Sequence, residues 1–179
     1  MTSARGEVIL VDEKDNEVGR AEKISAHSGP GRLHRAFSVF ILNDQGEVLL
    51  QRRAPSKYHS PGLWANACCS HPQPGEDLEC SARERLQEEL GFTTAISRIG
   101  TVLYHLRLMQ GLVEHELDHV FIGVYNGQID PNPSEVSEYR WVEIASLIAD
   151  LAAHPDSYAP WLGAILPVLV EHLPKKSEE

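Results

Sequence analysis

A short segment near the middle of the chain places a thiol, an imidazole and several carboxylates close together. In WANACCSHPQPGE, residues 64–76, Cys69 follows Cys68 directly and stands two residues before His71. An acidic stretch that is typical of a helix follows it. Three kinds of chemistry use such a set, namely a zinc site, a nucleophilic cysteine and a cysteine that transfers a proton. The segment alone leaves all three open.

The alternation of side chains limits which cysteine can act. If the segment is extended, Cys68 and Cys69 point to opposite faces, and His71 shares the face of Cys69. The sequence lacks the C-x-x-C partner that a structural zinc finger needs. Cys80 stands alone within the acidic helix, and we expect it to be inert core packing, as lone cysteines usually are.

Histidines and glutamates elsewhere form a candidate metal site. In VEHELDHV, the period of two of a strand places Glu114 and Glu116 on one face and His115 on the other. Imidazoles with carboxylates suit Mn²⁺, Zn²⁺ or Fe²⁺ better than Mg²⁺ alone. On spacing alone, solvated loop histidines and a solvent-facing Glu-x-Glu pair explain the same pattern. The five candidate ligands are His27, His34, His71, Glu114 and Glu116.

The helix in SARERLQEELGF carries a second set of carboxylates. Glu84 and Glu88 share one helix face, whereas Glu89 falls on the next. One interpretation is a solvated helix with charge pairs between successive turns. The other is a helix that presents a carboxylate to Mg²⁺, which in turn binds a phosphate.

The elements that must position these residues are strands mixed with helices. The alternation and the turn residues predict two short strands in EVILVDEKDNEVGRAEK and a hairpin from HRAFSVFIL to GEVLLQRR, with loops at SAHSGPGRLH and RAPSKYHSPG. Apolar periodicity, capping residues and Gly91 predict further elements. These are a helix over Asp77–Leu90, strands at Arg98–His105, Val113–Tyr125 and YRWVEI, a helix at Ala145–Ala153, and a last helix from Pro160 that Pro167 kinks or breaks. This mixture favours an α/β sheet domain covered by helices.

Composition narrows the class of protein. The chain has 179 residues, which favours one domain, and its 42% hydrophobic content allows a full core. A net charge of −10 argues against nucleic-acid or anionic-membrane partners, but a local basic pocket can still bind a small anion. Neither a membrane-spanning apolar run nor a signal pattern is present, and the three cysteines fit a reducing cytoplasm. PKKSEE at the end is predicted to fray.

Several segments, taken in order, resemble a known family. They are AHSGPGRLHRAFSVF, RRAPSKYHSPGLWANACCSHPQPGE, EELGF, VEHE and APW, and together they are similar to the type 1 isopentenyl-diphosphate delta-isomerases from about Val8 to Trp161. The resemblance implies a Nudix-type α/β/α sandwich with a mixed central sheet and additional N-terminal strands. It divides the chain into N-terminal strands and a metal-binding loop over 1–31, a Nudix domain over 32–166, and a helix end with a tail over 167–179.

The general Nudix box, G-x5-E-x7-R-E-U-x-E-E-x-G-U, is altered in this chain. Aligned on Gly91, Ser70 takes the place of the leading glycine, and the Arg-Glu pair is reversed as Glu84-Arg85. The box still supplies Glu76, Leu86, Glu88, Glu89, Gly91 and Phe92. Hydrolases of this fold use the helix glutamates to gather Mg²⁺ and activate water. The alteration weakens that reading, while the histidines and the cysteine favour the isomerase.

The resemblance also implies a role for each matching residue. The five candidate ligands match a site for Mn²⁺ or Zn²⁺, and Glu89 with the backbone carbonyl of Cys69 matches a site for Mg²⁺ that arrives with the substrate. The matching catalytic residues are Cys69, Glu116, Tyr104 and Trp161, and the matching diphosphate-binding residues are Lys23, Arg53, Lys57 and Arg85.

The activity implied is the interconversion of isopentenyl and dimethylallyl diphosphate by protonation and deprotonation of the alkene. The resemblance thus implies a small allylic or homoallylic diphosphate as partner, and a monomer or weak homodimer. Two other functions stay open on the residues. One is a Nudix hydrolase of an organic diphosphate, which would not need Cys69, and the other is a non-catalytic module that folds around a structural metal.

Overall fold

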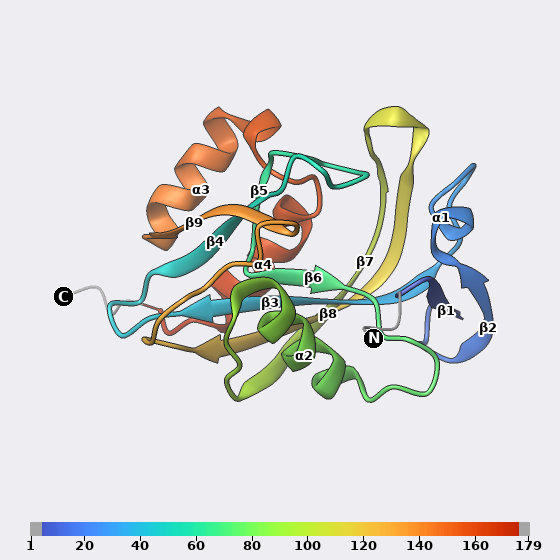
Figure 1. Cartoon of the computed structure of the whole chain (residues 1–179), viewed down its shortest axis with the longest axis horizontal. Helices are drawn as coiled ribbons and strands as arrows, with labels where there is room; N and C mark the ends of the chain where they lie inside the picture. Colours follow the sequence, from blue (N-terminus) through green and yellow to red (C-terminus); the bar gives the residue numbers. More distant parts are fainter. Residues whose placement is uncertain (1–4, 176–179) are drawn as a thin grey trace.

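The computed structural model describes residues 5–175, in which nine strands form one sheet with helices on both faces (Figure 1). The strands are β1 (Glu7–Val11), β2 (Glu17–Glu22), β3 (His34–Leu42), β4 (Val48–Arg53), β5 (Trp64–Ala65), β6 (Cys68–Ser70), β7 (Ile96–Arg107), β8 (Val113–Val124) and β9 (Val136–Val142). The helices are α1 (Lys23–Ala26), α2 (Leu78–Leu90), α3 (Ile144–Ala153) and α4 (Leu162–His172). The 3₁₀ turns η1 (Met109–Gly111) and η2 (Pro155–Ser157) complete the set. Most predicted elements are confirmed, with bounds shifted by a few residues.

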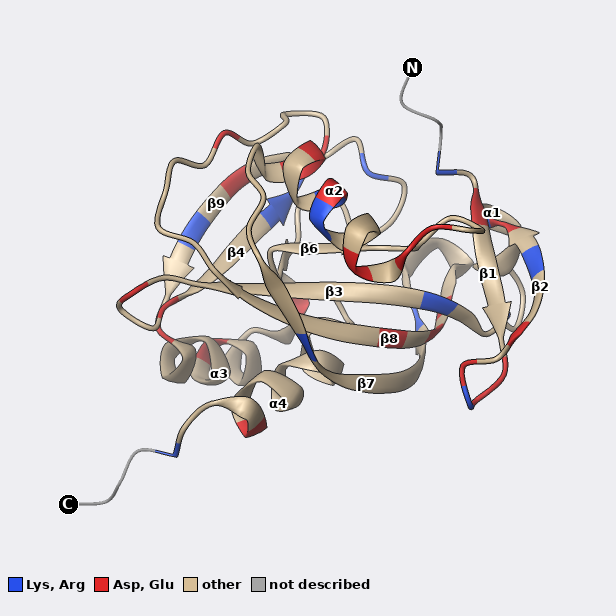
Figure 2. Cartoon of the chain, turned by 90° about the horizontal axis from the view of Figure 1, so that it is seen from below, with Lys and Arg blue, Asp and Glu red and all other residues tan. Residues whose placement is uncertain are grey.

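Strand β3 explains the sandwich, because both of its faces are buried. Phe37, Val39 and Ile41 pack with the apolar side of α2. Phe40 and Leu42 point the other way and pack with α3 and α4. Figure 2 shows α2 on one side of the sheet and the two later helices on the other. A strand covered on both faces has a continuous apolar sequence rather than an alternating one, as HRAFSVFIL does.

Helix α2 starts and stops at the predicted signals. The Asp77 side chain accepts from the Cys80 backbone N–H as an N-cap, and Gly91 ends the helix with a φ of 74°. The stripe of apolar residues is buried as expected, but the prediction for Cys80 is wrong, because this cysteine is exposed. Cys80 is two residues from Leu78 and two from Ala82. Each helical residue rotates the side chain by about 100°, so Cys80 points about 200° away from the apolar residues that face the core.

Strand pairing brings distant segments to one corner of the sheet. Strand β8 runs parallel to β3, with His34 opposite Glu116, and antiparallel to β7, with Tyr104 also opposite Glu116. Short strand β6 pairs antiparallel with the other side of β3 and places Cys69 opposite Ser38. Four strands, β3, β6, β7 and β8, therefore meet around the middle of the predicted site, and the sheet is mixed, as predicted.

The last helix differs from its prediction in two ways. It begins at Leu162 rather than Pro160, and of the two effects predicted for Pro167, a kink or a break, the break does not occur. Pro167 and Gly163 both lie on the exposed side, so water can reach the carbonyl that lacks its usual N–H partner. Buried residues before and after the proline hold the helix together. Helix α4 is thus continuous across the predicted boundary at 166/167.

The two termini were predicted to hold a pair of N-terminal strands and a C-terminal tail, and the structure describes the first but only part of the second. The N-terminal strands β1 and β2 form the expected hairpin and join the main sheet through Leu10 and His34. Short helix α1, at Lys23–Ala26, lies where the predicted strand segment passes into the predicted loop. The predicted tail extends into residues 176–179, which lie outside the described part. Within residues 5–175, no helix has the length and apolar character needed to cross a membrane.

Gly31 closes the loop between His27 and β3 against β8. Its φ is +76°, and an added Cβ would lie 2.6 Å from Cγ1 of Val113. Gly29 has a similar φ of +61°, yet a Cβ there would meet nothing within 4 Å. We therefore expect Gly31→Ala to lower the free energy of unfolding by roughly 1–3 kcal/mol more than Gly29→Ala does. Urea denaturation of both variants measures this difference, and equal losses would refute the steric argument.

Candidate active site

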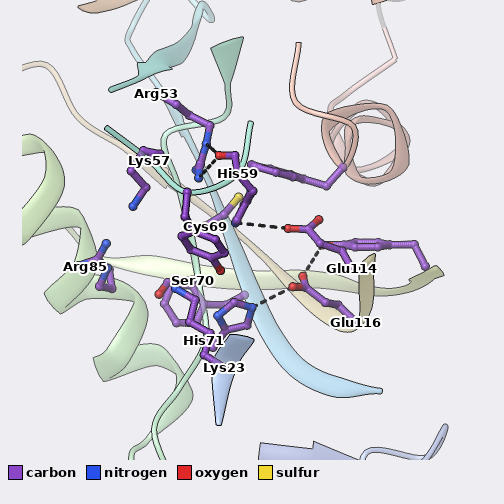
Figure 3. A pocket seen from close by; sticks show the side chains of 14 residues that line it. Lys23, Arg53, Lys57, His59, Cys69, Ser70, His71, Arg85, Glu114 and Glu116 are labelled. Carbon is purple, nitrogen blue, oxygen red and sulfur yellow. Dashed lines mark hydrogen bonds and ion pairs between the residues drawn. The ribbon is translucent and has the colours of Figure 1, made fainter. Parts of the chain in front are cut away.

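A pocket opens between β3, β6, β8 and the loop that follows β4. Its lining is Lys23, Phe37, Arg53, Lys57, Tyr58, His59, Cys69, Ser70, His71, Arg85, Tyr104, Glu114, Glu116 and Trp161. Figure 3 shows Arg53, Lys57 and Arg85 on one side, Glu114 and Glu116 on the other, and Cys69 between them. One end of the pocket is thus cationic, and the other carries carboxylates.

Four of the five predicted metal ligands converge at the carboxylate end. The Nε2 atoms of His71, His34 and His27 lie 2.8, 3.2 and 3.5 Å from Oε1 of Glu116. One ligand atom from each of these four buried residues lies within 4.8 Å of all the others. The histidines come from the end of α1, the start of β3 and the end of β6, so three separate segments surround one oxygen.

Hydrogen bonds behind the imidazoles fix which nitrogen faces the cluster. Nδ1 of His27 lies 2.7 Å from the carbonyl oxygen of Lys23, and Nδ1 of His34 lies 2.8 Å from that of Arg32. A carbonyl only accepts, so each Nδ1 carries a proton and donates it, and the Nε2 of each ring is the atom that faces Glu116. Nε2 of His27 is buried and has no hydrogen-bond partner. Three imidazole nitrogens and a carboxylate oxygen that converge in this way form a donor set that fits a divalent metal.

Glu114, the fifth predicted ligand, lines the same pocket but stands apart from the four. Its Oε1 lies 3.9 Å from Nε2 of His59, and its Oε2 is buried without a hydrogen-bond partner. Burial, followed by the charge of Glu116, raises the pKa of the Glu114 carboxyl well above its usual range. Both glutamates share one face of β8, as predicted, and that face is buried rather than solvated.

Cys69 faces the pocket, whereas its neighbour does not. The Cys69 thiol donates to Oδ1 of Asn66 at 3.0 Å, and Oγ of Ser38 lies 3.2 Å from the sulfur. Burial and the charge of Asp118 raise the pKa of this thiol well above that of a free cysteine. Cys68 is fully buried on the opposite face against α2. The predicted alternation across β6 is therefore present.

A buried network joins Tyr104 to two carboxylates. The Tyr104 hydroxyl lies 2.7 Å from Oε2 of Glu116 and 3.0 Å from Oδ2 of Asp118, and it can donate to only one at a time. Ser38 donates to the same Oδ2 of Asp118 at 2.6 Å. Burial, then the charge of Glu116, raises the pKa of Asp118 to about 8. Cys69 and Glu116 are thus linked through Ser38, Asp118 and Tyr104.

The four predicted basic residues all line the cationic end. Lys57 pairs with Glu135 at 2.6 Å, and Arg85 reaches the same carboxylate at 3.6 Å. Burial and three neighbouring cations, Lys57, Arg85 and Arg53, lower the pKa of Lys23 to about 8. Repelling cations that are held close together in a pocket favour a multiply charged anion as ligand.

Glu89 is the buried member of the acidic helix. It accepts from Arg85 at 2.6 Å and from the Gln51 side chain at 2.9 Å, beside the pocket rather than in its lining. The prediction of a solvated helix face holds for exposed Glu84 but is wrong for Glu89, which is 5% exposed. Both Glu89 oxygens therefore accept hydrogen bonds in a buried position next to the cationic end.

Trp161 closes the apolar wall of the pocket. Its indole nitrogen donates to Oδ1 of Asn66 at 3.2 Å, and the ring packs edge to face with His59 at a centroid distance of 5.7 Å. The guanidinium carbon of Arg53 lies 5.1 Å from the ring centroid, a cation–π contact. The indole thus already has one charged group near its face.

The sequence analysis did not predict several residues of the site, among them Ser38, His59, Asn66 and Asp118. Asp118 continues the period of two that selected Glu114 and Glu116, so that signal was available. Ser38 and Asn66 gave no such signal, because they act through hydrogen bonds set by strand pairing. His59 lies in a segment that reads only as loop.

Comparison with known proteins places these features in a family. The model of the NUDIX domain matches residues 32–162. A crystal structure from Deinococcus radiodurans superposes with a TM-score of 0.75 at 22% identity and covers 90% of this chain and 97% of that one. A MutT protein from Methanosarcina mazei Go1 gives a TM-score of 0.62 at 20% identity, over 78% and 91% of the two chains. These two structures support the fold alone.

Closer relatives share the sequence over most of its length. Isopentenyl-diphosphate Delta-isomerase 2 of Aromatoleum aromaticum is 46% identical over 160 residues, 89% of this chain and 84% of the relative. Isopentenyl-diphosphate Delta-isomerase of Nocardia farcinica is 47% identical over 162 residues, 90% and 93% of the two. With its NUDIX fold and its thiol, carboxylate and cation-lined pocket, the chain belongs to the isopentenyl-diphosphate Delta-isomerase family.

Proposed function

We propose that this protein interconverts isopentenyl diphosphate and dimethylallyl diphosphate, as the names of its relatives indicate for them. The observation that carries the proposal is a single pocket with a thiol and a carboxylate–phenol pair at one end and four cations at the other. A five-carbon chain with a diphosphate head needs these two ends. The reaction moves one double bond, so a proton is added at one carbon and another is removed from a neighbouring carbon.

The cationic end binds the diphosphate in this proposal. Lys23, Arg53, Lys57 and Arg85 supply the positive charges, and none of them has to break a bond in the substrate. Burial and the neighbouring cations lower the pKa of Lys23, and an anion beside it would favour its charged form. Glu89, with the Cys69 carbonyl, would hold Mg²⁺ against the same diphosphate.

The other end moves the protons. Cys69 and the Glu116–Tyr104 pair act as the two proton carriers, one on each side of the alkene. An alkene is a weak base, so a positioned acid is needed, and such general acid–base catalysis contributes typically about 10²–10⁴-fold in rate. The carrier that donates a proton and the carrier that accepts one exchange states in each turnover.

The histidine cluster would hold Mn²⁺ or Zn²⁺ through His27, His34, His71 and Glu116, with Glu114 nearby. When bound, such an ion fixes and polarises the Glu116 carboxylate. Tyr104 orients the other carboxylate oxygen with its hydrogen bond. The buried walls around both oxygens keep water from the reacting carbons.

Trp161 would stabilise the positive charge that develops on the hydrocarbon. We expect Trp161→Phe to keep at least about tenfold more turnover than Trp161→Ala, because a phenyl ring retains part of a cation–π attraction that is worth about 2 kcal/mol when desolvated. Steady-state rates per folded molecule, with thermal midpoints on the same samples, measure this. If Trp161→Ala is only less stable and its folded fraction turns over normally, the ring serves packing alone.

Incubation with isopentenyl diphosphate in D₂O tests the function. The expected product is dimethylallyl diphosphate that carries deuterium, with no phosphate released. Phosphate release without deuterium incorporation would favour a Nudix hydrolase instead. The altered Nudix box, with Ser70 at the leading glycine and Glu84-Arg85 reversed, argues against that outcome.

A further inference from the structure

Asn66 lies between β5 and β6 and is fully buried. Its amide nitrogen donates to the carbonyl oxygens of Val39 at 3.0 Å and Cys68 at 2.9 Å. Only the nitrogen end of a carboxamide can donate, so these two carbonyls decide which end of the side chain faces the pocket. The amide is therefore locked with its oxygen toward the site.

The oxygen end joins two pocket residues that are distant in sequence. Oδ1 accepts from the Cys69 thiol at 3.0 Å and from the Trp161 indole nitrogen at 3.2 Å. Cys69 lies on β6, whereas Trp161 is the N-cap residue of α4, near the C-terminal end of the sequence. One fixed oxygen thus limits the distance between the sulfur and the indole to the sum of two hydrogen-bond lengths.

We propose that Asn66 is a positioning residue that sets the spacing between the Cys69 sulfur and the Trp161 ring around the substrate. This rests on the proposed function, in which the sulfur carries a proton and the ring faces the resulting positive charge. A displacement of about 1 Å in such an arrangement can cost about 10²-fold in rate. The thiol remains free to turn about its Cβ–Sγ bond, because a thiol is a weak donor and leaves Oδ1 at little cost.

The two ends of the Asn66 side chain separate this role from a structural one. The nitrogen end ties two backbone segments together and contributes to stability. The oxygen end contacts only the thiol and the indole among its hydrogen-bond partners. A variant that loses the nitrogen but keeps the oxygen distinguishes the two contributions.

Asn66→Ala and Asn66→Asp supply that comparison. Both remove the amide donors, but only alanine removes the acceptor. Burial keeps the introduced carboxyl protonated, so one oxygen still accepts while the other donates to a backbone carbonyl. We expect Asn66→Ala to lower kcat about 10- to 100-fold with KM changed less than about threefold. Asn66→Asp should recover most of that loss, with rates compared per folded molecule.

A spectroscopic signal tests the contact itself. The indole N–H cross-peak of Trp161, assigned by its disappearance in Trp161→Phe, should shift in Asn66→Ala and stay near its place in Asn66→Asp. Asn43→Ala is the matched control. The Asn43 amide oxygen accepts from the backbone of Gln45 and Glu47 in the turn after β3, away from the pocket. This control should lose stability and keep both kcat and the cross-peak.

The outcomes separate the positioning role from the function. If the unaltered protein isomerises and the two Asn66 variants lose kcat equally, Asn66 is structural and the proposal is overturned. The same holds if Asn66→Ala keeps full kcat. If the unaltered protein does not isomerise at all, the proposed function fails, and the positioning role fails with it.

Discussion

Cys69→Ala is expected to abolish isomerisation, with kcat lowered by at least about 10³-fold, while the protein stays folded. The substitution removes one of two proton carriers, and neither Ser38 nor Asn66 can replace it. Ser38 already donates its hydroxyl proton to Asp118, and the Asn66 amide protons are directed at backbone carbonyls. Turnover of isopentenyl diphosphate and the thermal midpoint are measured on the same preparation.

Cys68→Ala is the matched control, one residue away on the same strand. Cys68 is fully buried among the apolar side chains that contact α2, so its truncation should lower the thermal midpoint. Its side chain does not line the pocket, and kcat per folded molecule should stay within about threefold of the parent. Equal losses of turnover in the two variants at equal stability would refute the assignment of Cys69.

Removal of metal from the histidine cluster is expected to abolish turnover and to destabilise the protein. Without a cation, the three Nε2 atoms and the Glu116 carboxylate lose the partner that would join them in a buried site, and the carboxylate loses its fixed orientation. Metal analysis of the purified protein should give close to one transition-metal ion per chain. Chelation should then lower both the thermal midpoint and the rate, and restored metal should return both.

His71→Ala should reproduce the effect of chelation, because it removes the imidazole closest to Glu116. His154→Ala is its control, since that histidine is exposed and pairs only with Asp150. A metal-free sample that works at full rate with Mg²⁺ also withheld would exclude both proposed ion sites. Unchanged metal content in His71→Ala would exclude the histidine cluster alone.

Local signals allowed much of this fold to be predicted from the sequence. Helix α2 follows from Asp77, a four-residue apolar spacing and Gly91, all of which act within the helix itself. At Pro167, a local signal competes with tertiary packing. Pro167 disfavours a helix locally, but the buried residues around it outweigh that cost. Cys80 was assigned from the usual burial of cysteine rather than from its angle on the helix.

In the site as well, features that depend on local geometry were predictable, whereas features that depend on tertiary pairing were not. The period of two in β8 correctly paired Glu114 with Glu116, because it depends only on strand geometry. The neighbours of Glu116 depend instead on which strands pair and in what register, and that information is not local. The family resemblance supplied the histidines, the cysteine and the tyrosine as a set. It did not supply Asn66 or Ser38, whose contacts follow from the pairing of β3 with β6 and from the approach of α4.

The parallel pairing of β3 with β8 also bears on how the protein is made. His34 and Glu116 are 82 positions apart in the chain, and contacts of such long range form late and slowly. During synthesis, the three histidines leave the ribosome well before Glu116 does, because the chain grows from its N-terminus. The complete ligand set therefore exists only after β8 has emerged and joined the sheet. In the proposed metal site, binding of an ion by all four ligands thus has to wait for β8, although β9 has still to join β4 at that stage.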